Sequence, residues 1–570
     1  MTMKRREFLK MMAASAGASA LPLAGAIGCA SKPAAHTASP ASLTGTEWQD
    51  VVNEAWGTSG ASGGPDTWDG VPLQSPTDIA DLSGDGPFKA NWDSLLAYEA
   101  PEWYRDAKFG IWAHWSPQCV PEDGDWYARN MYIQGQDQYQ NQVKRYGHPS
   151  VFGYKDLCAQ WTLLNWEPAA LIERYKKAGA KLFLALANHH DGFDAWNSKH
   201  HPWNAQNIGP RRDVIGEWAA AARQQGLRFG VTVHAASNWW WFQVAHLYDR
   251  TGPLAGVPYD GHLTLDNGVG QWWQGFDPQQ LYCRRHGIHE NPDEAYVRNF
   301  YKRVRDLIDQ HDPDLLYFDN SGLPLGWAGM NIGAYFYNHN LKARNGAMEA
   351  VLNIKEVPDS HAKAVVADYE RGVTNRIMPY AWQSETCLGD WHYNRSRFLY
   401  HYYMKPQEAI HWLIDAVSKN GTFILNVPGK PDGTIDADEQ AILDAIGKWM
   451  QVNGEAIYAT RPWKIFGEGK HHNKGGSFKG AGQLDADDVR FTRNKRGDVI
   501  YAIVLGWPDG DFVISSLGVA SETQPGGIKH VELLGSHEKL NWNQSNESLT
   551  VKKPDGKPCD FAFALKLSMV

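Results

Sequence analysis

The sequence predicts an α/β protein, a (β/α)8-like TIM barrel followed by a small C-terminal antiparallel β-sandwich. Three observations support this fold class. Apolar, strand-like runs alternate with helical segments over about 350 residues, which is typical of a parallel sheet. Several of these runs end in polar residues, as the strands around a barrel active site do. Beyond about residue 456, short strands follow one another with turns and no helix between them.

The first segment, residues 1–29, has the features of an export signal. Arg5 and Arg6 resemble a twin-arginine motif, and the small-residue apolar run 11–28 follows them. The run ends at Cys29 in a stretch that resembles a lipobox, with Ala where Leu is usual. The sequence therefore predicts an exported protein, periplasmic or anchored to the outer membrane of a bacterium, and leaves a lipid anchor at Cys29 open.

The next segment, residues 30–100, is predicted to be a linker and an irregular N-terminal extension. Residues 30–45 are rich in Ala, Ser, Pro and Thr, which is typical of a flexible tether. Residues 46–100 contain many Gly, Asp and Pro and show little periodicity.

The barrel is predicted over residues 101–455. Helices are expected over residues 168–180, 211–225 and 295–311, and the last of these has a one-sided period of 3.6 residues. Asp436 and Glu439 begin a further helix in the pattern of a capping box. Strand-like runs start near Lys108, Lys181, Arg228, Asp314, Ala350, Ala364 and Thr422.

The C-terminal sandwich is predicted over residues 456–570. Strand-like runs cover residues 489–492, 499–505, 531–534 and 549–551, with a turn over residues 494–498. Short strands joined by turns pack as two antiparallel layers more readily than as a barrel with helices.

Composition excludes several classes of function. The formal net charge of -9 argues against nucleic acid or an anionic membrane surface as a partner. Apart from Cys29 the cysteines are scattered and form no CxxC pair, so neither a zinc knuckle nor a disulfide framework is predicted. The 26 Trp suit either a large core or surfaces that stack on sugar rings.

The strand ends carry the candidate site. His114 follows the run 109–113, His189 and His190 lie just after the apolar run 181–187, and Asp319 follows 315–318. Because the active site of a (β/α)8 barrel lies at the C-terminal ends of its strands, these side chains are expected to converge.

Six segments together resemble family 29 of the glycoside hydrolases, the retaining α-L-fucosidases. They are KFGIWAHWSP (108–117), DWY (125–127), NHHDGFDAWNSK (188–199), GPRRDVIGEWAAAARQQGLRFGV (209–231), LLYFDN (315–320) and FILNVPGKPDGTI (423–435). The match runs in order over residues 102–454, and the family's C-terminal β domain fits as well. The resemblance implies an irregular barrel, a terminal α-L-fucosyl substrate and no cofactor.

Retaining hydrolysis requires two carboxyl groups, a nucleophile and a general acid/base. Asp319 matches the family's nucleophile. For the acid/base we favour Glu370, which ends the strand-like run 364–369. Further candidates downstream are Glu385 (the second choice), Glu356 and Glu349.

The resemblance also implies residues that hold the sugar. His114, Trp126, His189 and His190 match positions that contact fucose hydroxyls and ring faces, and Lys355 is placed to keep Asp319 ionised. Tyr127, His234 and Trp382 are also expected to contact the substrate. Close metal-ligand spacings such as H-E-x-x-H are absent from the sequence, so no metal site is predicted.

The chain departs from the family pattern at three places. Asp125 replaces a Glu before Trp-Tyr, the segment 232–234 replaces Tyr-Tyr-Ser, and Gln383 replaces a Glu after Trp. His234 is expected to take over a contact with a sugar hydroxyl. The Trp-rich insertion 237–291 is open to two interpretations, a set of leaving-group subsites or a cover over the barrel rim.

These observations predict an exported retaining exo-α-L-fucosidase that acts on fucosylated oligo- or polysaccharides. α-L-Galactosidase activity is the alternative within the same mechanism, because a pocket rejects an added hydroxyl only modestly. A non-catalytic fucose-binding protein is an alternative of a different class, opposed by the presence of both acids. A metal-dependent barrel hydrolase is a third alternative.

Overall fold

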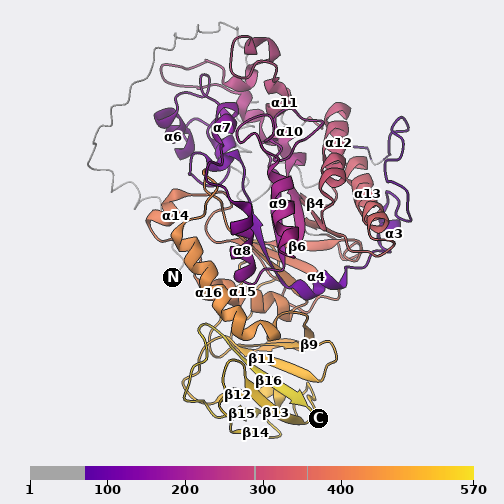
Figure 1. The fold of residues 1–570 in the computed structure, drawn as a ribbon, viewed down its shortest axis with the longest axis vertical. Coiled ribbons are helices and arrows are strands. Elements are labelled where there is room, and N and C mark those ends of the chain that lie inside the picture. Colours follow the sequence, from indigo (N-terminus) through magenta and orange to yellow (C-terminus); the bar gives the residue numbers. More distant parts are fainter. Residues whose placement is uncertain (1–70, 73, 288–289, 356) are drawn as a thin grey trace, which may run out of the picture. The chain divides into compact units, whose positions relative to one another are not determined.

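A computed structural model describes residues 71–570 except 73, 288–289 and 356. The export signal, Cys29 and the tether 30–45 lie outside the described residues. Eight parallel strands close into a barrel in chain order, from β1 to β8 and back to β1 (Figure 1). The strands are β1 (Phe109–Ala113), β2 (Leu182–Asn188), β3 (Arg228–Val233), β4 (Leu315–Ser321), β5 (Val351–Lys355), β6 (Val366–Glu370), β7 (Trp382–Cys387) and β8 (Gly421–Asn426).

The closed barrel confirms the predicted fold class, and seven of its strands lie where apolar runs predicted them. β7 was not predicted as a strand. Its sequence, WQSETC, is mostly polar, although every one of its residues is buried. Gln383 and Glu385 form hydrogen bonds with interior residues of the barrel, whereas Ser384 accepts one from Trp412, on a helix outside it. Polar residues thus occupy both faces of β7, so the usual apolar signal of a buried strand is missing.

Helices cover the outside of the barrel, as Figure 1 shows for α8, α9, α12 and α13. The three predicted helices appear as α8 (Pro168–Lys177), α9 (Val214–Gln224) and α12 (Glu294–His311). The later ones are α13 (Trp327–Ala343), α15 (Pro406–Ser418) and α16 (Ala437–Asn453). The predicted capping box begins α16, since Asp436 accepts from the Glu439 amide and Glu439 accepts from the Asp436 amide.

The barrel is irregular on one side. Among the described residues, turns and no helix connect β5 to β6 and β6 to β7. Long segments follow β1 and β3 instead, and they contain short helices such as α5 (Tyr127–Asn130) and α10 (Asn238–Trp241). The loops that can shape a site are therefore concentrated after β1 and β3.

The C-terminal region forms two antiparallel sheets, as predicted. The first has the order β13-β16-β11-β10-β9 and the second the order β12-β15-β14. Their strands are β9 (Arg461–Glu468), β10 (Val489–Arg493), β11 (Val499–Val504), β12 (Phe512–Ile514), β13 (Ile528–Leu533), β14 (Trp542–Gln544), β15 (Leu549–Val551) and β16 (Phe563–Met569). Apolar side chains from both sheets share one core, which defines a sandwich.

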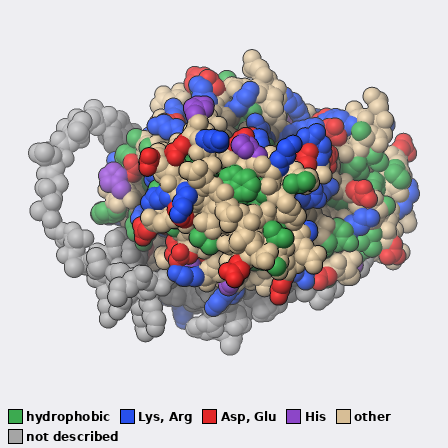
Figure 2. Space-filling model, turned by 90° about the horizontal axis from the view of Figure 1, so that it is seen from below, with side chains coloured by type: hydrophobic (Ala, Val, Ile, Leu, Met, Phe, Trp, Pro, Cys, Tyr) green, Lys and Arg blue, Asp and Glu red, His purple; other side chains and the backbone are tan. Residues whose placement is uncertain are grey.

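Figure 2 shows one face of the molecule with basic and acidic side chains intermixed. This face therefore has no extended basic surface of the kind that binds nucleic acid, in agreement with the net charge of -9. Within the described residues, every helix is too short or too polar to span a lipid bilayer.

Candidate active site

Asp319 lies near the end of β4, where the apolar residues of the strand give way to polar ones. Its Oδ1 contacts the Lys355 ammonium, and its Oδ2 lies 2.9 Å from His234 Nδ1 and 3.2 Å from His190 Nε2. The donors come from the ends of β5, β3 and β2. Asp319 is buried, so these three neighbours define its environment.

These neighbours keep Asp319 ionised. Burial alone raises the pKa of the carboxyl, but the Lys355 charge, followed by His234 and His190, outweighs burial and holds the pKa well below its usual value. Burial likewise lowers the pKa of Lys355, and the Asp319 and Glu370 carboxylates outweigh it and raise this pKa well above its usual value. The pair is therefore charged on both sides at neutral pH.

Glu370 is the last residue of β6, and its carboxyl group points into the same site. Its Oε2 contacts the Lys355 ammonium, and its Oε1 accepts a hydrogen bond of 3.2 Å from Trp391 Nε1. Two oxygens in contact with one nitrogen lie within about 6 Å of each other. Asp319 and Glu370 are thus close enough to act on the two sides of one bond.

Glu385 lies beside Glu370 in the register of β6 and β7 but is more deeply buried. Its Oε1 accepts a hydrogen bond of 3.0 Å from the Tyr317 hydroxyl. Burial, followed by the charges of Asp368 and Glu370, raises the pKa of Glu385 well above its usual value. Glu385 is therefore a neutral acid beneath the site, supporting the layer that faces substrate.

The remaining two acids are not brought to the site. Glu349 precedes β5 and pairs with Arg228 at the start of β3, which places it at the opposite end of the barrel. Glu356 is one of the residues whose placement the structure does not describe.

His114 is the histidine most available to a ligand. Neither of its ring nitrogens has a hydrogen-bond partner within the described part of the chain, although the ring is buried. The rings of His189, His234 and His392 surround it, with centroids 4.8 to 5.1 Å away. Burial lowers the pKa of His114 well below its usual value, so the ring is neutral and offers one donor and one acceptor.

His189 is held in one tautomer by its neighbours. Gln118 Nε2 donates 2.9 Å to Asp191 Oδ2, which fixes the orientation of the amide, and it also lies 2.7 Å from His189 Nδ1. Nδ1 must then accept, which leaves the proton of the neutral ring on Nε2. Burial lowers the pKa of His189 well below its usual value.

His190 and His234 do more than the sequence predicted. Both contact Asp319, and His190 Nδ1 lies 2.9 Å from the His234 carbonyl oxygen. Burial lowers the pKa of His234 to about 4. The two rings orient the Asp319 carboxylate, in addition to any contact with a sugar.

Two residues expected to hold substrate lie elsewhere. Tyr127 is fully buried and its hydroxyl donates 3.0 Å to Gln142 Oε1, away from the site. Trp382 is the first residue of β7, is buried, and donates 2.9 Å to the Lys419 carbonyl oxygen. A side chain at the start of a strand lies far from the C-terminal ends of the barrel strands, where the site is built.

Trp126 and the Trp-rich insertion meet at the rim. Trp126 is half-buried, with its ring centroid 6.4 Å from that of Trp241. Trp241 in turn lies 5.7 Å from His190 and 5.9 Å from His189. Since the insertion residues 239–241 are buried, this part of the insertion covers the barrel rim rather than offering free stacking faces.

The structure adds residues that the sequence did not single out. Trp391 and His392 follow β7, and Gln118 follows β1. His392 is buried with its Nε2 2.9 Å from Ser116 Oγ. The criterion that found His114 could not find Trp391 and His392, because β7 has no apolar signal, and Gln118 lies five residues beyond the end of β1.

Two groups of histidines have ring nitrogens close enough to suggest a metal ion. They are His114, His189 and His392, and His189, His190 and His234, with the ligand atoms of each group within 4.8 Å of one another. In the second group, His190 and His234 already contact Asp319. The same nitrogens suit sugar hydroxyls, which both donate and accept hydrogen bonds.

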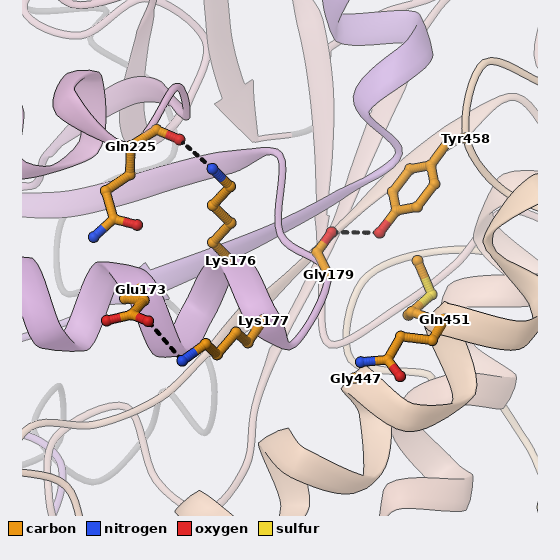
Figure 3. A pocket seen from close by; sticks show the side chains of 9 residues that line it. Glu173, Lys176, Lys177, Gly179, Gln225, Gly447, Gln451 and Tyr458 are labelled. Carbon is orange, nitrogen blue, oxygen red and sulfur yellow. Dashed lines mark hydrogen bonds and ion pairs between the residues drawn. The ribbon is translucent and has the colours of Figure 1, made fainter.

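A separate pocket lies at the opposite end of the barrel, between α8, the end of α9 and α16 (Figure 3). Its polar groups are largely paired with one another. Lys176 donates 2.8 Å to the Gln225 carbonyl oxygen, and Glu173 pairs with Lys177 at 2.6 Å. It lies at the N-terminal end of β2, so it is not part of the site.

The closed barrel holds the ionised carboxylate of Asp319 with the Glu370 carboxyl group beside it. The neutral rings of His114 and His189 form the floor of the site. Two neighbouring carboxyl groups are what a glycoside hydrolase requires. Comparison with known proteins agrees. The family model described as Alpha-L-fucosidase matches residues 78–455, and the one described as Alpha-L-fucosidase C-terminal domain matches residues 484–568.

Human tissue α-L-fucosidase is 26% identical over 85% of this chain and 92% of its own length. An α-L-fucosidase of Branchiostoma floridae is 25% identical over 85% of this chain and 96% of its own length. The structure of Thermotoga maritima α-fucosidase in complex with fucose is similar at a TM-score of 0.62, with 25% identity over 84% of this chain and 100% of that one. The protein belongs to the α-L-fucosidase family, and it is a glycoside hydrolase.

Proposed function

We propose that the protein is a retaining exo-α-L-fucosidase that releases terminal α-L-fucosyl residues from glycans by double displacement. The observation that carries this proposal is that Asp319 and Glu370 contact the same ammonium group. Retaining glycosidases place their two carboxyl groups about 5–5.5 Å apart, whereas inverting enzymes leave room for a water molecule. The shared contact with Lys355 favours the shorter separation.

The roles of the two acids follow from their surroundings. Asp319 is ionised, so it attacks the anomeric carbon while Glu370 protonates the leaving oxygen, giving a fucosyl-enzyme and a free alcohol. Glu370 then removes a proton from water, which attacks the same carbon and releases α-L-fucose. Two displacements on one carbon restore its configuration.

The buried histidines support recognition of a terminal sugar. His114 offers two unpaired ring nitrogens, His189 offers a fixed Nε2 donor, and the Trp241 ring lies beside His189. Buried groups at the ends of the strands support exo action, because a glycan cannot extend past them into the barrel. Hydrogen bonds that strengthen in the transition state contribute to catalysis as well as to binding.

An aryl α-L-fucoside and the matching α-L-galactoside test the proposal directly. We expect turnover of the fucoside, slower turnover of the galactoside, and α-L-fucose as the first product by ¹H NMR. A first product in the β configuration would overturn the retaining mechanism. Preference for the galactoside would favour the α-L-galactosidase alternative. Binding of fucose without turnover of either substrate would show that the protein is a non-catalytic fucose-binding protein.

We also propose that the protein is exported, because Arg5, Arg6 and the apolar run 11–28 resemble a twin-arginine signal. The mature protein is then expected to lack residues 1–28. If Cys29 is lipidated, Cys29→Ser should move the protein from the membrane fraction to the soluble periplasmic fraction. Unchanged membrane association in this variant would refute lipidation and leave export intact.

A further inference from the structure

The segment between β9 and β10 returns from the C-terminal region to the barrel and contacts the end of β6. The Phe478 amide donates 2.7 Å to the Glu370 carbonyl oxygen, and the Gly480 amide donates 2.9 Å to the Arg371 carbonyl oxygen. A chain segment nearly 110 residues after Glu370 is thus bonded to the main chain of the proposed acid/base.

The approach of the two segments requires glycine. A Cβ atom on Gly372 would lie 2.2 Å from the Gly476 carbonyl oxygen, which no side chain tolerates. Gly476 itself has a φ of +111°, in the region that favours glycine. The close contact therefore depends on a glycine in each segment, Gly372 and Gly476.

Phe478 is unusual in two respects. Its side chain is 51% exposed, and its backbone has a φ of +58°. The left-handed region is unfavourable for a residue with a Cβ, and such strain is concentrated at functional sites. Burial in a core explains neither feature, because an exposed position with this backbone is better filled by Gly or Asn.

The segment also lies outside the regions that the two family models match. The two family matches end at residue 455 and resume at residue 484, so Phe478 lies in neither. What the family predicts for the site therefore does not include this residue.

We propose that residues 475–480 form a binding site for the leaving-group saccharide, with the ring of Phe478 as its stacking surface. This inference rests on the proposed function of Glu370. A general acid must lie within hydrogen-bond reach of the oxygen that it protonates, so the leaving sugar lies against Glu370. The exposed aromatic residue bonded to the main chain of Glu370 is the surface that this sugar meets, and a pyranose presents an apolar C–H face to it.

Phe478→Gly tests the proposal, because glycine removes the ring and also relieves the left-handed backbone, so the variant is expected to fold. We expect kcat/KM for a fucosylated oligosaccharide to fall about 3- to 10-fold, the range of an aromatic stacking contact. Inhibition by free L-fucose, which occupies only the fucosyl pocket, should not change. Transfer of fucose from an activated aryl fucoside to an added sugar acceptor should fall relative to hydrolysis.

Phe478→Trp should retain the oligosaccharide activity, and Gln524→Gly, which relieves a φ of +45° elsewhere in the C-terminal region, should leave every value unchanged. Equal activity of wild type and Phe478→Gly on the oligosaccharide would overturn the inference, as would an equal loss of fucose binding. If wild type itself fails to hydrolyse fucosides, the proposed function fails instead, and the two failures are distinguished.

Discussion

Asp319 and Glu370 contact one and the same positive charge, the Nζ of Lys355. The contact does two things. It keeps the Asp319 carboxyl ionised in a buried site, and it fixes the separation of the two acids. Four strand ends, those of β2, β3, β4 and β5, supply Asp319 and its three neighbours.

The first prediction concerns the nucleophile. Asp319→Gly should lose nearly all turnover, because no covalent intermediate can form. Azide should occupy the vacated space and give β-L-fucosyl azide, which mass spectrometry and NMR detect. Asp319→Asn, of the same shape as the native residue, should be equally inactive but not rescued. Activity near that of wild type in either variant would rule out Asp319.

The second prediction concerns the acid/base. Glu370→Ala should still form the fucosyl-enzyme rapidly from a dinitrophenyl fucoside, whose leaving group needs no proton. It should fail on natural oligosaccharides, and azide should accelerate it and give α-L-fucosyl azide.

Glu385→Gln is the matched variant for this test, because it replaces the neighbouring buried acid without changing its shape. It should impair both substrates alike and give no azide product. If the azide product appears with a Glu385 variant and not with Glu370→Ala, the acid/base is Glu385.

The third prediction concerns Lys355. Lys355→Met removes the charge that holds the pKa of Asp319 low, so the pKa of Asp319 should rise. Because Asp319 must be ionised to attack, the acidic limb of the kcat/KM profile should move to higher pH. Lys355→Arg keeps the charge and should retain the wild-type limb. Identical profiles for wild type and Lys355→Met would contradict this role.

The fourth prediction concerns the histidines. Ala substitutions of His114, His189 and His190 should each lower kcat/KM more than about ten-fold. Each substitution leaves a buried hydroxyl of the bound sugar or, for His190, the Asp319 carboxylate without its partner, at a cost on the order of 1–3 kcal/mol. The exposed His401 serves as the control, and His401→Ala should have wild-type activity. Activity lost on chelation and restored by a divalent ion would show instead that the histidines bind a metal.

The fifth prediction concerns stability. Burial lowers the pKa of His392 to about 3, so between pH 6.5 and 3 the unfolded chain binds a proton that the folded chain does not. The free energy of unfolding is therefore not reduced by His392 above pH 6.5, and it falls progressively as the pH is lowered from 6.5 toward 3. His392→Gln should flatten the dependence by up to about 1.4 kcal/mol per pH unit. Urea unfolding of both proteins from pH 7 to 4 measures it, and parallel curves would contradict it.

The sequence alone determined the fold class and most of the site. Apolar runs and helical periods depend only on neighbouring residues, so seven barrel strands and helices α8, α9 and α12 could be predicted. Asp319, Glu370 and His114 could be located for the same reason, because each directly follows or ends an apolar run and barrel strands point their C-terminal ends to one face.

Only the tertiary structure decided which side chains meet. The direction of a side chain at a strand end depends on its register with neighbouring strands, whose paired residues can lie 15 (Ala367 and Trp382) or 314 (Phe109 and Phe423) positions apart in the sequence. A local pattern carries no information on that register. For this reason the contacts of His190 and His234 with Asp319 emerged only in three dimensions, as did the displacement of Tyr127 and Trp382 from the site. The same holds for Phe478, which reaches Glu370 because the chain folds back across the barrel.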